Sequence, residues 1–263
     1  MPKPLLYLNW NANFGPPVST PLWTPADITT AAWYDASDAS TITESGGAVS
    51  QWDDKSGNLK HLTQGVGAQQ PQTGGSIGGV DAIEFDGTDD WMVAPSLGLT
   101  SDAMFIAVFD PDAETNYSIA GTTGGNTHID LLTASTYQRV FRTTRLGAAV
   151  LGMPTNAPTI LAYNADSGAP KFNTHINGAD TQLDTSAFTF EDNITDICSR
   201  GGGTSSWLNG PLGEIVILDR FASDAERQKL EGYLAWKWDG GVAGTLVGLL
   251  PALHPYKSAP PTA

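Results

Sequence analysis

Residues 208–238 read LNGPLGEIVILDRFASDAERQKLEGYLAWKW and predict one strand followed by one helix. The β-branched run Glu214–Leu218 is bounded by turn residues on both sides, which is typical of a short, largely buried strand. Ser223 and Glu226 have the spacing of a capping box, and leucine or tryptophan then recurs every four residues from Leu230 onward. We therefore expect a buried strand and then a helix at about 223–238.

The rest of the chain carries short apolar or alternating runs separated by turn residues, with no second helix signal of comparable strength. The runs lie at 31–36, 49–52, 83–87, 91–93, 104–109, 128–132, 138–143, 159–163, 172–176 and 181–183. Asn177-Gly178, between the last two, is a strong signal for a type I′ hairpin turn. Roughly a dozen short strands at this spacing predict an all-β sandwich or barrel, so the helix must dock on sheet.

Length, charge and cysteine content restrict the class of protein. A chain of 263 residues suits one all-β domain. Its net charge of −15 disfavours nucleic acid as a ligand, because nucleic-acid binding rests on basic patches. Cys198 is the only cysteine, so no internal disulfide is expected, and we interpret it as a small buried apolar side chain.

Neither end of the chain predicts a membrane anchor. The apolar patch after Lys3 ends before a secretory core is reached, and the run at 247–253 is too short and too interrupted to span a bilayer. We expect a protein made in a host cytoplasm without a signal peptide and without a membrane partner.

Residues 1–29 combine repeated prolines with large apolar side chains and predict an extended arm, which precedes a domain at 30–263 with an extended C-terminal tail. Proline opposes both helix and central strand, while exposure of the apolar groups to water is unfavourable. We expect the arm to lie on a partner, and wrapping of its own domain is the alternative. The apolar residues of the arm are Leu5, Leu6, Tyr7, Leu8, Trp10, Phe14 and Trp23.

Six motifs, taken in order, resemble the concanavalin A-like, laminin-G-like jelly-roll modules of tailed-phage structural proteins and large bacterial surface proteins. The resemblance covers about residues 30–261. It implies a two-sheet antiparallel jelly-roll sandwich with the helix near the C-terminus packed at its edge. The motifs are WYDASD at 33–38, QWDDKSGN at 51–58, FDGTDD at 85–90, GEI at 213–215, EGYLAWKW at 231–238, and Leu250-Pro251 with His254-Pro255-Tyr256.

Glycoside hydrolases of related folds need two carboxylates, about 5–5.5 Å apart in retaining enzymes and about 6.5–9.5 Å apart in inverting ones. The laminarinase-like members of this superfamily use a Glu-x-Asp-x-x-Glu strand, and that pattern is absent here. Glu214 and Asp219 are five residues apart, which places them on opposite faces of a strand. We interpret Glu214 as a strand-end residue and expect no catalytic residues and no enzymatic activity.

Two tryptophans are candidates for ligand binding, because sugar rings stack on exposed aromatic faces beside polar groups. Trp207 follows the polar, glycine-rich run 201–206, and Trp91 follows two acidic residues. For each of them the alternative is packing in the core.

Acidic residues could supply oxygen ligands for calcium, which takes six to eight of them. The alternative is that these aspartates form turns by accepting hydrogen bonds from nearby backbone N–H groups. We expect no other cofactor. The calcium candidates are Asp86, Asp89 and Asp90, together with Asp53 and Asp54.

These observations favour a non-enzymatic virion component of a tailed phage, such as a capsid decoration, head-fibre or tail-associated protein. It would be attached through its arm to other virion proteins and would form a homo-oligomer in the assembly. The alternative is a lectin-like carbohydrate-binding module that acts on a cell-surface glycan. A glycan hydrolase or lyase is disfavoured by the missing carboxylate pattern.

Overall fold

The computed structural model describes residues 22–97, 102–112, 117–123, 129–132, 137–140, 157–166, 171–184 and 194–263. Its strands are β1 (Ala32–Asp35), β2 (Ile42–Ser45), β3 (Ala48–Trp52), β4 (Leu62–Thr63), β5 (Gln72–Ile77), β6 (Val80–Asp86), β7 (Met92–Val93), β8 (Ala103–Phe109), β9 (Tyr117–Gly121), β10 (Ile129–Leu132), β11 (Tyr137–Val140), β12 (Thr159–Asp166), β13 (Lys171–Ile176), β14 (Ala179–Asp184), β15 (Asp196–Ile197) and β16 (Asn209–Leu218). The helices are α1 (Asp224–Trp238) and α2 (Thr245–Leu249), and three 3₁₀ turns are η1 (Pro25–Asp27), η2 (Ala39–Thr41) and η3 (Gly67–Gln69).

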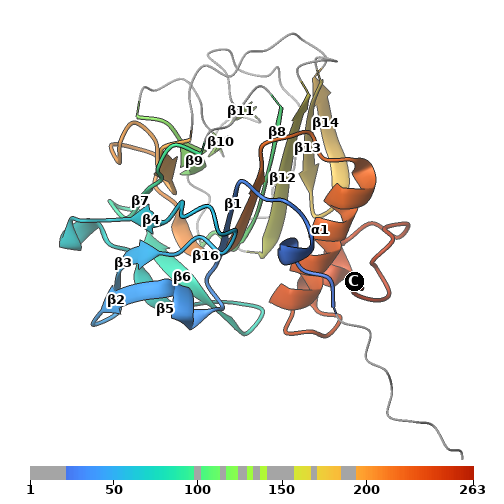
Figure 1. The fold of residues 1–263 in the computed structure, drawn as a ribbon, viewed down its shortest axis with the longest axis horizontal. Helices are drawn as coiled ribbons and strands as arrows, with labels where there is room; N and C mark the ends of the chain where they lie inside the picture. Colours follow the sequence, from blue (N-terminus) through green and yellow to red (C-terminus); the bar gives the residue numbers. More distant parts are fainter. Residues whose placement is uncertain are drawn as a thin grey trace, which may run out of the picture.

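The described strands form an antiparallel β-sandwich, which confirms the predicted fold class. Hydrogen bonds join them in the order β11-β10-β9-β15-β7-β4-β3-β5-β6-β16-β8-β12-β13-β14, with β1 on β16 and β2 on β3. The path bends, so that β2 to β7 lie on one side of the molecule and β8 and β12 to β14 on the other (Figure 1). One hydrogen-bonded path therefore supplies both layers of the sandwich.

The strand β16 is the centre of this arrangement. Its first residues pair with β6, its later residues pair with β8, and β1 pairs along the same later residues. Every residue from Gly210 to Leu218 is buried. The predicted buried strand is confirmed, but it begins at Asn209 and not at Glu214.

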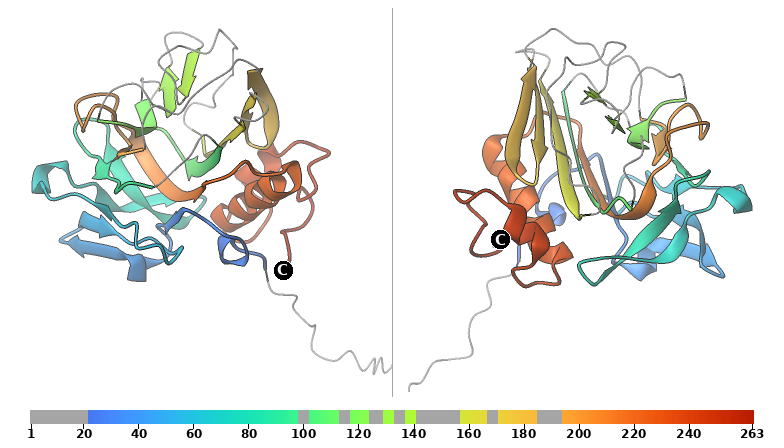
Figure 2. Two further views of the ribbon diagram at one scale, coloured as in Figure 1. Left: turned by 45° about the horizontal axis from the view of Figure 1, so that its top comes forward. Right: turned by 180° about the vertical axis from the view of Figure 1, so that it is seen from behind.

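The predicted helix is confirmed as α1, which packs on the sheet beside β12 and β8 (Figure 2). Ser223 and Glu226 form the expected capping box. Leu230, Leu234 and Trp238 are all 0% exposed, so the four-residue recurrence is the docked face. Gly240 and Gly241, both with positive φ, follow the helix end. The short helix α2, which has no strong sequence signal, comes next.

The two ends of the described chain meet beside α1 (Figure 1). Leu22 forms an antiparallel bridge with Thr262, and the Trp23 N–H donates to the Pro261 carbonyl at 3.1 Å. Among the described residues, neither helix has the length and apolar character needed to cross a membrane.

Candidate functional site

Trp91 lies half-buried just before β7, where segments from distant parts of the chain meet. Its indole Nε1 donates to the Gln69 side-chain oxygen at 3.3 Å, and its backbone carbonyl accepts from Gln64 Nε2 at 3.0 Å. Gly203 lies against the ring, since a Cβ built there would be 2.2 Å from the indole Nε1. The contacts with Gln69 and Gly203 therefore restrict the orientation of the indole.

A buried carboxylate holds the glycine-rich loop 201–204 beside Trp91. Asp196 is 0% exposed, its Oδ2 accepts the Gly202 N–H at 2.7 Å, and its Oδ1 accepts the Thr123 hydroxyl at 3.3 Å. The three glycines of the loop have φ of +66°, +71° and +75°, which glycine adopts without strain. The loop is thus held in place by Asp196. We call Gln69, Trp91, Thr123 and residues 201–204 together the Trp91 surface.

The turn that leads into Trp91 carries three carboxylates. Asp86 Oδ1 accepts the backbone N–H groups of residues 88, 89 and 90 at 2.8, 3.2 and 3.4 Å, which is the turn-forming role weighed from the sequence. The carboxylate oxygens of Asp86, Asp89 and Asp90 also lie within 4.8 Å of one another, so they could hold a cation such as calcium.

The pKa of Asp90 is raised well above its ordinary value. Asp90 is 5% exposed, and burial, followed by repulsion from the Asp86 and Asp89 carboxylates, raises its pKa to about 7. The turn therefore concentrates negative charge next to the Trp91 surface.

Trp207, the other aromatic candidate, follows the same glycine-rich loop but differs in its surroundings. It is half-buried, and its indole Nε1 is enclosed with no hydrogen-bond partner in the described part of the chain. The structure brings Trp91 against the loop that leads to Trp207, yet the polar edge of Trp207 is turned inward. Trp91 is therefore the better placed of the two for a solvent-borne ligand.

Of the seven large apolar residues named for the predicted arm, Trp23 alone lies within the described residues. Trp23 is 4% exposed, and its ring meets the Tyr233 ring edge to face, with centroids 6.0 Å apart. Lys229 Nζ lies over the Trp23 ring, 5.1 Å from its centroid. Trp23 thus packs on its own domain. Leu5, Leu6, Tyr7, Leu8, Trp10 and Phe14 lie outside the described residues.

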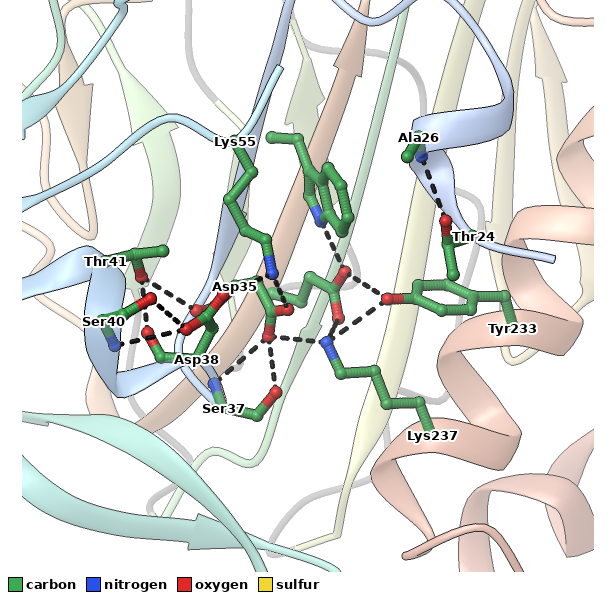
Figure 3. Close-up of polar contacts among 12 residues, drawn as sticks. Thr24, Ala26, Asp35, Ser37, Asp38, Ser40, Thr41, Lys55, Tyr233 and Lys237 are labelled. Carbon is green, nitrogen blue, oxygen red and sulfur yellow. Dashed lines mark hydrogen bonds and ion pairs between the residues drawn. The ribbon is translucent and has the colours of Figure 1, made fainter. Parts of the chain in front are cut away.

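A dense polar cluster lies elsewhere, between β1, β16 and α1, where the Lys237 side chain from α1 points toward Asp35 (Figure 3). At its centre Glu214 is 0% exposed and accepts four hydrogen bonds. The donors are Trp33 Nε1 at 2.7 Å, Tyr233 Oη at 3.0 Å, Lys237 Nζ at 2.6 Å and Trp238 Nε1 at 2.9 Å. We call Asp35, Lys55, Glu214, Tyr233 and Lys237 the α1 clamp.

The clamp contains a carboxylate pair from two strands that are far apart in the sequence. Asp35 on β1 lies opposite Glu214 on β16, and Lys237 Nζ contacts Asp35 Oδ1 at 2.5 Å and Glu214 Oε2 at 2.6 Å. The interpretation of Glu214 as a strand-end residue is wrong, because β16 begins five residues earlier. Its acidic neighbour comes from another strand, so no spacing within one strand could reveal it.

The electrostatics of this pair suit a structural role. Burial raises the pKa of Glu214, whereas the Lys237 charge and its hydrogen bond outweigh burial and lower the pKa of Asp35. Both oxygens of Glu214 are occupied by protein donors, and Asp35 also receives Lys55 at 2.9 Å. Neither carboxylate is available to a substrate, so the clamp holds α1 and β1 to the sheet.

Several solved structures have a fold similar to that of this chain at low sequence identity. Domain 4 of a GH43 extracellular arabinanase from Geobacillus stearothermophilus, in complex with arabinotriose, has a TM-score of 0.55 at 14% identity, with 77% of this chain and 98% of that chain covered. A GH54 α-L-arabinofuranosidase has a TM-score of 0.59 at 13% identity, with 85% and 67% covered. The receptor-binding domain of a botulinum neurotoxin C/D mosaic serotype has a TM-score of 0.53 at 9% identity, with 77% and 51% covered.

At these identities the similarity concerns the fold alone, and it agrees with the predicted jelly-roll type of β-sandwich. No protein-family model matches the chain, and no curated protein matches it in sequence.

Proposed function

We propose that this chain is a carbohydrate-binding β-sandwich module without catalytic activity, and that the Trp91 surface holds the sugar. The observation that carries the proposal is the half-buried Trp91 indole, which is bonded to Gln69 and lies against Gly203 in a loop that also carries the exposed residue Thr204. A sugar presents a C–H face to an aromatic ring and hydroxyl groups to polar neighbours. Because the ring and the loop are held by internal contacts, little ordering is needed on binding.

The acidic turn beside the Trp91 surface determines which sugars it can bind. Asp86, Asp89 and Asp90 lie on the turn next to Trp91, and their mutual repulsion contributes to the raised pKa of Asp90. A sugar that carries a carboxylate or sulfate would add to this repulsion. We therefore assign neutral or amino sugars to the site and not acidic ones.

The comparisons support the sugar-binding alternative better than the virion role. Domain 4 of the arabinanase is described in complex with arabinotriose, and none of the three similar structures is described as a virion protein. The non-catalytic part of the proposal is supported by the α1 clamp, whose two buried carboxylates are occupied by lysine, tryptophan and tyrosine donors.

A glycan array probed with the full chain tests the proposal. We expect binding to neutral oligosaccharides and no binding to their sialylated or sulfated forms. Trp91→Ala should weaken binding at least about tenfold, because loss of one stacked aromatic removes about 1.5 kcal/mol or more. The same incubations should release no reducing ends.

A matched tryptophan variant distinguishes loss of the Trp91 surface from a general loss of stability. Trp236 is a second half-buried tryptophan with a bonded indole nitrogen among the residues that the structure describes, and it lies on α1. Trp236→Ala should leave glycan binding unchanged while its Tm is recorded in parallel. Equal loss of binding in both variants, or no neutral glycan bound at all, would refute the assignment of the Trp91 surface.

A further inference from the structure

The α1 clamp holds an amine and a carboxyl group in contact within the protein, and sugar binding at the Trp91 surface makes no use of them. Lys237 Nζ lies 2.5 Å from Asp35 Oδ1, and the two side chains are 20% and 6% exposed (Figure 3). They come from α1 and β1, which are at opposite ends of the domain sequence. Groups that a rigid frame holds in contact react as if at very high concentration.

A reaction between them requires a base, because an ammonium group is not a nucleophile until it loses a proton. Glu214 Oε2 lies 2.6 Å from Lys237 Nζ, within the reach that a general base needs. Glu214 is 0% exposed, and burial raises its pKa, which increases its affinity for a proton. Glu214 is therefore placed to take the proton from Lys237.

The Asp35 carboxyl group is polarised at both of its oxygens. Lys55 Nζ donates to Oδ2 at 2.9 Å, and the Ser37 hydroxyl and backbone N–H donate to Oδ1 at 2.7 and 3.2 Å. These donors draw electron density away from the carboxylate and make its carbon, Cγ, a better target for an amine.

Lys55 also contacts Asp35, but its surroundings do not favour the same reaction. Its second carboxylate contact is Asp38 Oδ2 at 2.8 Å, and the Asp38 side chain is 35% exposed. The hydrogen bond from Lys55 lowers the pKa of Asp38 to about 2, so Asp38 is a weak base. Of the two lysines on Asp35, Lys237 is the one that contacts a fully buried carboxylate.

We propose that Lys237 and Asp35 form an amide bond with each other, with Glu214 as the catalytic base, so that α1 and β1 become covalently joined. Glu214 takes one proton from the Lys237 ammonium, and the nitrogen lone pair attacks Asp35 Cγ to form the C–N bond. Glu214 then passes its proton to the departing carboxylate oxygen, and the attacking nitrogen supplies a second proton. The Cγ–O bond breaks and water leaves.

The reaction is balanced without a further reactant. One ammonium and one carboxylate give one neutral amide and one water, and Glu214 returns to its starting form. The bond would form once in each chain, so it differs from turnover of a glycan, and it is independent of the Trp91 surface.

Intact-mass measurement of the denatured full chain tests the proposal. We expect the unmodified protein to be lighter than its sequence by one water molecule, and a protease digest to contain the Asp35 peptide joined to the Lys237 peptide. Lys237→Arg, which keeps the charge, and Glu214→Gln, which removes the base, should both have their full sequence mass. If either variant fails to fold, fragmentation of the joined peptides from the unmodified protein still identifies the bond.

Lys229→Arg is the matched control, because Lys229 also lies on α1 but has its Nζ over the Trp23 ring. This variant should retain the loss of water. The full sequence mass in the unmodified protein would overturn the proposal, and so would a loss of water that maps to ring closure at Asp86-Gly87 or Asp239-Gly240. A joined peptide pair that persists in Glu214→Gln would contradict the role of Glu214 as the base.

Discussion

The acids of the α1 clamp and the acids of the 86–90 turn are arranged in opposite ways. In the clamp, Glu214 and Asp35 share Lys237, and Lys55 joins Asp35 to Asp38 at 2.9 and 2.8 Å. In the turn, three carboxylates converge within 4.8 Å, and among the described residues no salt bridge reaches them. The clamp uses its charges to join elements, whereas the turn leaves its charge available to a ligand or a cation.

The largest expected effect comes from breaking the clamp. Glu214→Gln replaces one acceptor oxygen with an N–H₂ group, which faces either Lys237 and the Trp238 indole or the Trp33 indole and the Tyr233 hydroxyl. It also removes the negative charge that pairs with Lys237. We expect a loss of about 3–5 kcal/mol in the free energy of unfolding, measured by urea denaturation. Asp219→Asn, at an exposed acid next to the same strand, should change it by less than about 0.5 kcal/mol. Equal effects would mean that the clamp is not structural.

Substitution of an apolar residue on α1 separates the contribution of packing to the free energy of unfolding from that of charge. Leu234 is 0% exposed on the docked face of α1, so Leu234→Ala should cost about 2–5 kcal/mol through lost contact and a residual cavity. Leu253→Ala, at a site that is 96% exposed, is the control. A change below about 0.5 kcal/mol for Leu234→Ala would contradict the docking of this helix face.

Next to the 86–90 turn, Gly203→Ala should disturb the Trp91 surface. The residue has φ +75°, and a Cβ would lie 2.2 Å from the Trp91 indole, so the ring or the loop must move. We expect about 1–2 kcal/mol of lost stability and weaker glycan binding. Gly46→Ala, at φ +63° with nothing within 4 Å, carries the backbone strain alone and should leave binding intact.

The smallest effect concerns the unpaired charge of the turn. Because the folded pKa of Asp90 is raised to about 7 from 3.8, the folded state retains a proton that the unfolded chain loses, so this group lowers stability as pH rises from about 4 to 7. Asp90→Asn should therefore raise Tm at pH 7.5 and have little effect below pH 4, with a gain of about 1 kcal/mol in chelator. A uniform effect at all pH values would contradict this account.

Added calcium gives a further comparison of the Tm of the unmodified protein with that of Asp90→Asn. The sequence predicts calcium at Asp86, Asp89 and Asp90 as an option beside turn formation, and their oxygens are close enough to share an ion. If calcium binds, millimolar calcium should raise the Tm of the unmodified protein but not that of Asp90→Asn. An unchanged Tm in both would leave turn formation as the role of these aspartates.

The features that could be predicted from sequence are those encoded locally. The helix α1 begins within one residue of expectation, because its capping box and its terminal glycines are adjacent in the chain. The strand β16 starts five residues before the predicted strand, because Gly210-Pro211 has the sequence of a turn and not of a strand. Pro211 is instead paired with Glu84 on β6.

The site depends on contacts that no local pattern encodes. Trp91 could be selected from its acidic neighbours, but its partners Gln69 and Gly203 reach it only through the strand order. The strand β5 was missed because Gly74-Gly75 is typical of a loop, although Gly75 is required there by the close approach of Glu84 and Pro211. The Asp35–Glu214 pair requires the register of β1 on β16, which sequence spacing does not give.

The most direct test of the central claim is calorimetric titration of one neutral oligosaccharide, chosen from the array, into the unmodified protein, Trp91→Phe and Trp91→Ala. The sugar-platform account predicts that phenylalanine, which preserves an aromatic face, retains part of the affinity, and that alanine weakens it at least about tenfold while Tm stays within a few degrees. An unchanged affinity in the folded Trp91→Ala protein would contradict the account.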